Sequence, residues 1–160
     1  MPAKKLKEFL DSRQVKYVTI NHSAAYTAQE IASLAHVRGK ELAKTVIVNM
    51  DGKPAMAVLP AAYKVDLNRL RLAAGAEIVG LASEAEFKDL FPDCETGAMP
   101  PFGNLYSMAV FVEESLTQDD EIAFNAGSHR ELIRLAYKDF AQLVQPGVGK
   151  FAAQLWQVAG

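Results

Sequence analysis

The sequence predicts an α+β fold in which helices flank a mixed, twisted β-sheet. Helical and β-rich segments alternate irregularly, without the regular strand–helix repeat of a doubly wound α/β protein. Two predicted helix starts carry a capping box, a Ser or Thr followed three residues later by Glu, at Thr27/Glu30 and Ser83/Glu86. The pair Asp51-Gly52 between two β-rich runs indicates a β-hairpin.

In the first half of the chain, apolar spacing and turn residues define the expected elements. Leu6, Phe9 and Leu10 recur at helical spacing, and Ile31 and Leu34 do so after the Thr27 cap. The expected elements are a helix over about 2–13, a strand over 17–20, a helix from Thr27 to near Gly39, a strand over 43–50 and its hairpin partner over 54–59.

The second half is expected to continue the same mixture. The expected elements are a helix over 67–74 closed by Gly75, a strand over 77–81, a helix from the Ser83 cap through Leu90, and strands over 106–113 and 121–125. The segment 131–144 has two interpretations, either one helix or a strand to about residue 136 followed by a helix from 137.

Length and composition indicate a single domain over residues 1–160 that can form its own core, because half of the 160 residues are hydrophobic. The single cysteine, Cys94, cannot form an internal disulfide, and residues 1–16 lack the apolar core of a signal peptide. No apolar run approaches the roughly 18 residues of a transmembrane helix. We therefore expect a cytoplasmic protein with no membrane partner.

Charge and motif content narrow the partners further. The net charge of -2 gives no general attraction to nucleic acid, so no DNA partner is expected and RNA would have to be held at a local site. His22, His36 and His129 stand far apart and no Cys/His pair has zinc spacing, so neither a metal nor a cofactor is expected. The chain has no phosphate-binding loop, dinucleotide fingerprint or Gly-x-Ser-x-Gly elbow, and no sequence neighbour would activate Cys94 as a nucleophile.

Three segments could carry chemistry. Lys44 begins a β-rich run, where it is either a solvated flank or a fixed cation for a phosphate or an oxyanion. The segment 97–103 brackets two prolines with two glycines and is either a plain connection or a stiff loop that aims backbone groups at a ligand. The segment 125–129 ends in His129, which is either a surface histidine in a turn or a group that exchanges protons near pH 7. His22 after the first strand is open to a structural or a ligand-orienting interpretation.

In this order, the segments resemble the YbaK / prolyl-tRNA synthetase-associated editing-domain family. The resemblance covers roughly residues 6–146, and the order and spacing of the motifs are more specific than any motif alone. The matching residues are Ala43-Lys44-Thr45, the Gly-x-x-x-Pro loop of Gly97 to Pro101, the run from Phe124 to His129, and the upstream His22 and Tyr26-Thr27-Ala28.

The resemblance implies a highly twisted, partly closed sheet and an enzyme that hydrolyses the ester between a small amino acid and the terminal adenosine of a tRNA, without a cofactor. The partner would be an aminoacyl-tRNA, expected to be tRNA for proline, and the chain would act in trans, alone or within a synthetase complex. Lys44 and His129 would be catalytic, and the attacking water would be activated by the protein or by the tRNA ribose. The substrate-binding residues would be His22, Tyr26, Thr45, Gly97, Ala98, Met99, Pro100, Pro101, Phe102, Gly103, Asn125, Gly127 and Ser128.

The expected amino acid is alanine. Members that clear alanine resemble this chain in placing a histidine after the Ala-Gly step, and the bulk of Met99 and Pro100 would shrink the pocket. Two alternatives stay open: a deacylase for cysteinyl-, seryl- or threonyl-tRNA on the same fold, and a non-catalytic module that binds nucleotides or nucleic acid.

Overall fold

The computed structural model describes residues 4–21, 42–95 and 98–154. Its main strands are β1 (Tyr17–Asn21), β2 (Leu42–Met50), β3 (Lys53–Pro60), β5 (Val79–Leu81), β6 (Ala109–Glu113), β7 (Glu121–Asn125), β8 (Glu131–Ala136) and β9 (Gly147–Gly149). A separate two-stranded ladder joins β4 (Tyr63–Val65) and β10 (Ala152–Gln154). The α-helices are α1 (Lys4–Ser12), α3 (Leu67–Ala74), α4 (Glu84–Phe87) and α5 (Tyr137–Val144), and the 3-10 helices are η2 (Lys88–Leu90), η3 (Gly103–Leu105) and η4 (Glu114–Gln118).

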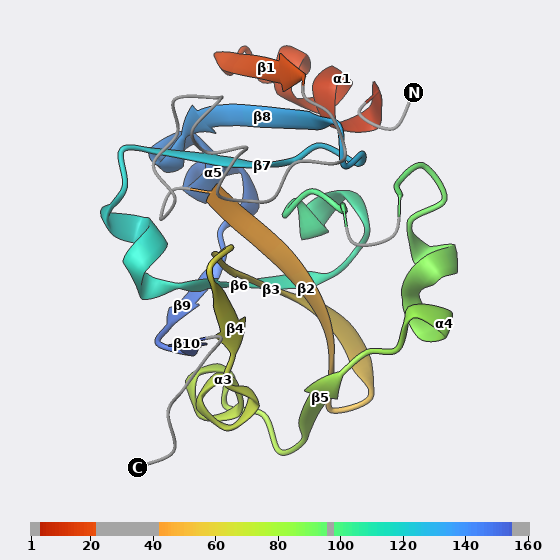
Figure 1. Cartoon of the computed structure of the whole chain (residues 1–160), viewed down its shortest axis with the longest axis vertical. Helices are drawn as coiled ribbons and strands as arrows, with labels where there is room; N and C mark the ends of the chain where they lie inside the picture. Colours follow the sequence, from red (N-terminus) through yellow and green to blue (C-terminus); the bar gives the residue numbers. More distant parts are fainter. Residues whose placement is uncertain (1–3, 22–41, 96–97, 155–160) are drawn as a thin grey trace.

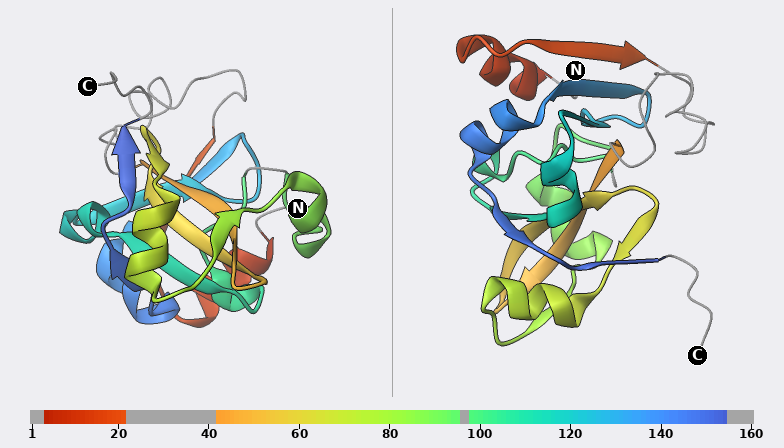
Figure 2. Two further views of the ribbon diagram at one scale, coloured as in Figure 1. Left: turned by 90° about the horizontal axis from the view of Figure 1, so that it is seen from below. Right: turned by 90° about the vertical axis from the view of Figure 1, so that its left-hand side faces the viewer.

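The sheet is mixed and strongly twisted. Within the described residues its strand order is β1-β8-β7-β2-β3-β6-β9, with β5 paired to β2 outside this path. The pairs β2/β7, β3/β6 and β6/β9 are parallel and the others antiparallel. In Figure 1, β7 and β8 run across the view while β2 crosses it diagonally, and the views in Figure 2 show the same rotation. This arrangement confirms the predicted α+β class.

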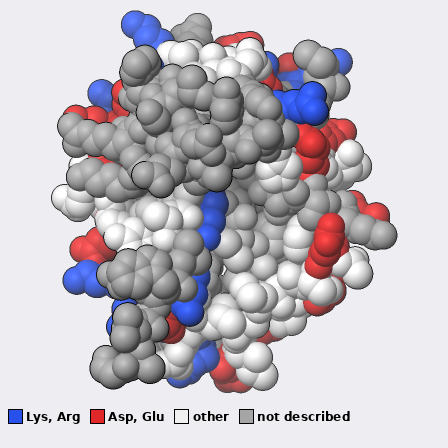
Figure 3. Space-filling view, in the orientation of Figure 1, with Lys and Arg blue, Asp and Glu red and all other residues white. Residues whose placement is uncertain are grey.

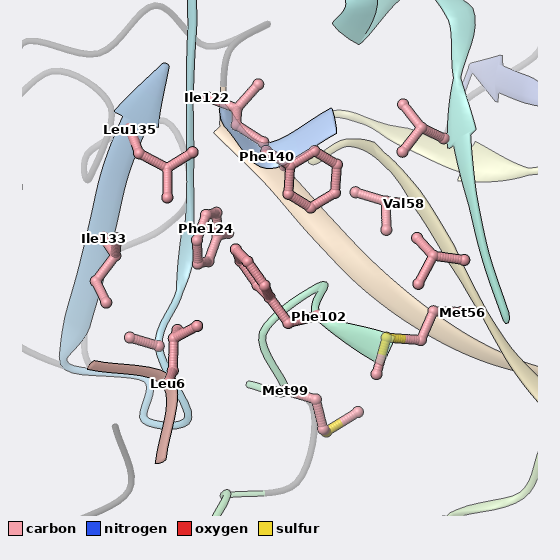
Figure 4. Close-up of a cluster of buried hydrophobic side chains, with 14 of the residues drawn as sticks. Leu6, Met56, Val58, Met99, Phe102, Ile122, Phe124, Ile133, Leu135 and Phe140 are labelled. Atoms are coloured by element: carbon pink, nitrogen blue, oxygen red, sulfur yellow. The ribbon is translucent and has the colours of Figure 1, made fainter. Parts of the chain in front are cut away.

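The main core lies on one face of the sheet and is covered by α1 and α5. Leu6 and Leu10 reach it from α1 and Phe140 from α5, as their helical spacing predicts. Phe102 lies at its centre, with ring centroids 5.6 Å from Phe124 and 5.4 Å from Phe140. Figure 4 shows Met99 in the same cluster, so the segment that follows residue 97 is anchored by two side chains.

Several local signals in the sequence produce the structures they predict. The Asp51-Gly52 turn joins β2 to β3, and α3 ends at Gly75, whose φ of 69° is left-handed. The start of α3 has a cap that was not predicted, in which the Asp66 carboxylate accepts the Arg69 N–H at 3.0 Å. The second capping box forms in both directions: the Glu86 N–H donates to Ser83 Oγ at 3.2 Å, and the Ser83 N–H donates to Glu86 Oε1 at 3.0 Å. The helix expected after Thr27 lies outside the described residues.

Two strands begin later than predicted, because the residues before them take part in other interactions or in a turn. The strand expected over 77–81 begins at Val79, because the carboxylate of Asp51 accepts the N–H groups of Glu77 and Ile78 at 3.0 and 2.8 Å. The strand expected over 106–113 begins at Ala109, because a turn with Ser107 at a φ of 57° comes first.

Two other segments also refine the predictions. The segment 131–144 is a strand followed by a helix, as the second of the two interpretations stated. The helix expected to run from Ser83 through Leu90 is divided into α4 and η2. The short strands β4, β9 and β10 were not predicted. Within the described part of the chain, no helix has the length and apolar character needed to span a bilayer.

Candidate functional site

The candidate site forms where β2 changes its strand partner. β2 pairs in parallel with β7 only at Leu42 and Ala43, and antiparallel with β5 only from Val48 onward. Between these ladders the Ile47 carbonyl accepts the Ala82 N–H at 3.0 Å. In the described residues, positions 44–46 therefore have no strand along this edge, which leaves the backbone of β2 open beside the start of the Asn125–His129 loop.

Lys44 lies on the face of β2 that looks away from the main core. Its register partner is Leu59, which belongs to a second apolar cluster with Val48, Leu70 and Phe151. The side chain is half-buried there, and this desolvation lowers the pKa of the Lys44 ammonium. The part of the chain that the structure describes supplies no ion-pair partner, so Lys44 is a partly desolvated cation that could bind an anionic group.

Thr45 lies on the opposite face of β2, toward the main core. Its register partner Val58 is a core residue, as are Ala43 and Ile47 on the same face. The Thr45 Oγ1 is buried and finds no hydrogen-bond partner among the described residues. Such a hydroxyl is uncommon in a native core and is a candidate for a contact with a ligand.

Two loops that are distant in sequence are joined by backbone hydrogen bonds. The Gly127 N–H donates to the Ala98 carbonyl at 2.8 Å, and the Glu95 N–H donates to the Gly127 carbonyl at 2.8 Å. The Ala98 N–H donates to the Glu95 carbonyl at 3.0 Å. Gly127 has a φ of 93°, a conformation that strongly favours glycine. The two predicted loop segments therefore form one joined structure.

The carboxylate of Glu95 adds a side-chain connection to this pair of loops. Its Oε1 accepts the His129 N–H at 2.9 Å, and the Ser128 hydroxyl also donates to the carboxylate. The bond from Ser128 and then that from His129 lower the pKa of Glu95. Glu95 is not among the residues predicted from the sequence, because no local pattern distinguishes it from the nearby Asp93.

Residues 98–103 include several with structural roles. The side chains of Met99 and Phe102 are buried in the main core, so the expectation that Met99 narrows an amino-acid pocket by its bulk is not supported by its packing. A Cβ at Gly103 would lie 2.4 Å from the Met108 carbonyl oxygen, so the need for close packing accounts for this glycine. Ala98, Pro100 and Pro101 are also buried. Contacts of Met99 and Phe102 with a substrate would have to come from their backbone groups.

Not every predicted site residue falls in the described structure. His22, Tyr26 and Gly97 lie outside the described residues.

Two predicted site residues, Asn125 and Lys44, lie side by side at the end of the β2/β7 ladder. They directly follow its last pair, Phe124 and Ala43. If this register continues by one residue, their side chains lie on the same face of the sheet.

The environment of Cys94 does not favour a thiolate. Burial raises the pKa of the Cys94 thiol, and its sulfur lies 3.6 Å from the Tyr106 hydroxyl. The Tyr106 pKa is raised too, mainly by burial, and the Lys5 ammonium lies 4.7 Å from the ring centroid. Since the thiolate is the nucleophilic form, this environment disfavours Cys94 as a nucleophile.

Charge on the surrounding surface is unevenly distributed. Figure 3 shows basic side chains down the middle of one face, over β2 and toward α3, and acidic side chains on the α4 side.

Within the described residues, no group of three or more His, Cys, Asp and Glu side chains is arranged to hold a metal ion. A hollow of about 1050 Å³ between α1 and α5 contains none of the predicted site residues. We therefore locate the candidate site at the joined loops and β2, and not at this hollow.

Comparison with known proteins links this geometry to a class of proteins. A family model described as an aminoacyl-tRNA editing domain matches residues 22–143. A protein from Escherichia coli strain K12, named multifunctional Ser/Thr-tRNA deacylase ProXp-y, is 26% identical over 152 residues, which cover 92% of this chain and 90% of the relative.

Solved structures share the fold. A crystal structure of a candidate trans-editing enzyme for prolyl-tRNA synthetase superposes with a TM-score of 0.82 at 19% identity, over 95% of this chain and 97% of that one. A candidate signal transduction protein from Marinobacter aquaeolei VT8 superposes with a TM-score of 0.72 at 14% identity, over 94% of this chain but only 31% of that one. At these identities the likeness concerns the fold alone.

Proposed function

This chain belongs to the aminoacyl-tRNA editing domain family, and we propose that it hydrolyses the ester that joins a small, wrongly attached amino acid to a tRNA. The observation that carries the proposal is the extent of the family match: residues 22–143 include β2, the loop that contains Ala98 and the loop that ends at His129. An editing hydrolase is needed because one methylene gives a synthetase pocket only about 1–3 kcal/mol of discrimination.

The chemistry of the site is consistent with direct attack by water. An aminoacyl ester is already activated, so positioning and charge stabilisation contribute more than a protein nucleophile. We propose that Lys44 is the cation that binds the substrate, because it is half-buried and has no carboxylate partner in the described part of the chain. We propose His129 as the second catalytic residue, which would hold the substrate together with Lys44 while water attacks. The His129 backbone N–H donates to the Glu95 carboxylate, which fixes its position.

The joined loops would form the wall beside the reacting ester. Backbone groups of the segment 98–101 are candidates to orient the ester carbonyl, since the bond between Gly127 and Ala98 holds this segment next to the Asn125–His129 loop. Thr45 would contribute its buried hydroxyl from the core-facing side of β2. His22, Tyr26 and Gly97 stay in the proposal on the strength of the family motifs.

For the amino acid, we propose alanine on tRNA for proline as the first candidate. Alanine is the smallest of the candidate side chains, and a tight wall can exclude proline, the correct amino acid, by steric conflict. Serine is a specific second candidate for two reasons. The relative from Escherichia coli strain K12 is named a Ser/Thr-tRNA deacylase, and the Thr45 hydroxyl, which has no hydrogen-bond partner among the described residues, could bond a substrate hydroxyl.

The test is a side-by-side deacylation assay with the purified chain. Alanyl-, seryl-, threonyl-, cysteinyl- and prolyl-tRNA for proline, and seryl- and threonyl-tRNA on their own tRNAs, are followed at equal concentration against a control without enzyme. Fastest hydrolysis of the alanyl ester supports the first candidate, whereas faster hydrolysis of the seryl ester selects the second. Tight tRNA binding without hydrolysis of any ester would contradict the enzyme assignment.

A further inference from the structure

Glu95 connects two segments that are far apart in the sequence. It is 34 residues from His129, yet its side chain accepts the His129 N–H at 2.9 Å and its backbone contacts Gly127 and Ala98. The Ser128 hydroxyl donates to the same carboxylate and accepts the Arg130 N–H at 3.0 Å. One acidic residue therefore contacts both loops of the candidate site: its backbone bonds to Ala98 and Gly127, and its carboxylate bonds to Ser128 and His129.

The donors at this position favour a carboxylate over a neutral polar group. A carboxylate offers two oxygens that only accept, so it can take the Ser128 O–H and the His129 N–H together. A glutamine offers one carbonyl oxygen, and its amide group adds hydrogens that face two donors. An aspartate keeps the charge but is one methylene shorter, so it would have to move the backbone to reach the same partners.

We propose that Glu95 is a positioning residue of the deacylase, one that holds His129 and the Ala98 backbone in the relative placement that hydrolysis needs. The inference rests on the proposed function and goes beyond it, because Glu95 does not belong to the family motifs identified in the sequence. Glu95 acts through Ser128 and His129 and does not itself touch the reacting ester. Its lowered pKa keeps the carboxylate charged throughout the neutral range.

Positioning of this kind has a measurable kinetic effect. The two backbone bonds to Gly127 involve no side chain of Glu95, so they persist when that side chain is changed. When the carboxylate is removed, the fold therefore stays intact, but the turn that ends at His129 loses the acceptor that fixes its position. A displacement on the order of 1 Å in a positioned group costs about 100-fold in rate, so the effect falls on kcat more than on KM.

The chain contains a matched control for Glu95. Glu86 is also an exposed carboxylate that accepts one backbone N–H, from Ser83 at 3.0 Å, and one side-chain donor, the amide of Asn49. The bond from the Ser83 backbone and then that from Asn49 lower the pKa of Glu86. It lies in the capping box of α4, outside the joined loops. Glu86→Gln thus removes a similar charge with similar bonds, but does not disturb His129.

The experiment compares Glu95→Gln, Glu95→Ala, Glu95→Asp and Glu86→Gln in the full chain. Steady-state deacylation is measured with the ester that the wild-type protein hydrolyses fastest, and amide exchange is measured at Gly127 and His129. We expect kcat to fall roughly tenfold in Glu95→Gln and up to about 100-fold in Glu95→Ala, with faster exchange at His129. Glu95→Asp should recover part of the loss, and Glu86→Gln should match the wild type in kcat and in both amides.

The outcomes separate this proposal from the proposed function. If Glu95→Ala hydrolyses the ester with wild-type kcat, Glu95 has no positioning role. An equal loss in Glu86→Gln would mean that the effect is general destabilisation, which also rejects the proposal. If the wild-type chain hydrolyses no ester in the panel, the proposed function fails first; unchanged exchange at His129 in Glu95→Ala would then reject the inference as well, and faster exchange would uphold the connection between the loops.

Discussion

Lys44 and Thr45 are consecutive in the sequence, but their side chains lie on opposite faces of β2. Lys44 is beside Leu59 and the smaller apolar cluster, whereas Thr45 is beside Val58 and the main core. Both residues lie in the short stretch of β2 that has no strand partner on one edge within the described residues. The two side chains are therefore in different environments, and their substitutions should have different effects.

Substitution of Lys44 should abolish activity without unfolding the protein. Lys44→Ala removes the proposed substrate-binding cation, and no ion pair to a described residue is lost with it. We expect a loss of deacylation of at least about 100-fold with a melting temperature within a few degrees of wild type. The matched control is Lys53→Ala, an exposed lysine on β3. Wild-type turnover in Lys44→Ala would contradict the assignment.

The lowered pKa of Lys44 has a consequence for stability against pH. Because burial depresses the folded-state pKa below the unfolded one, the unfolded chain binds more protons between the two values. The contribution of Lys44 to the unfolding free energy is thus unfavourable at neutral pH and rises as the pH increases through this window. Compared with Lys44→Met in urea unfolding, the wild type should gain relative stability between neutral and alkaline pH. A difference that does not change with pH would show that the ammonium is fully solvated.

Replacement of Thr45 by valine tests its buried hydroxyl. Valine has nearly the same shape and removes an Oγ1 that has no hydrogen-bond partner in the described residues. Thr45→Val should therefore leave the unfolding free energy unchanged or raise it by up to about 1 kcal/mol. If the hydroxyl binds a hydroxylated substrate, hydrolysis of the seryl ester should fall more than that of the alanyl ester. Equal effects on both esters would remove Thr45 from substrate selection.

Enlargement of Ala98 tests the proposed wall of the site. Ala98 is 0% exposed and its carbonyl accepts the Gly127 N–H, so a leucine there would have to displace one of the joined loops or fill the space beside them. We expect Ala98→Leu to hydrolyse the larger esters more slowly than the alanyl ester, relative to the wild type. Ala109→Leu on the exposed start of β6 controls for the added side chain. Unchanged rates for every ester would exclude the loop as the wall.

Activity should not depend on a metal ion. No ligand set has metal-binding spacing in the sequence, and no cluster of ligands is found among the described residues. Deacylation should therefore continue at the wild-type rate after dialysis against a chelator. Full loss in the chelator with recovery on addition of zinc would overturn this expectation.

Much of the local structure could be predicted because its causes are local. The Asp51-Gly52 hairpin, the Gly75 end of α3 and the Ser83/Glu86 capping box each depend on residues within a few positions of one another. The family motifs around Lys44, Ala98 and His129 were visible for a similar reason, since each is a short run of residues. The late starts of β5 and β6 were missed because they depend on side-chain and turn hydrogen bonds that compete with strand pairing.

The sequence by itself determined the fold class, the family and the short segments from which the candidate site is built. Only the tertiary structure decided how those segments meet. It separated Lys44 from Thr45 across β2, turned Met99 and Phe102 into the core, and brought Glu95 against Ser128 and His129. The physical reason is that these relationships depend on strand register and on hydrogen bonds between residues as much as 34 positions apart, and no local spacing in the chain encodes such contacts.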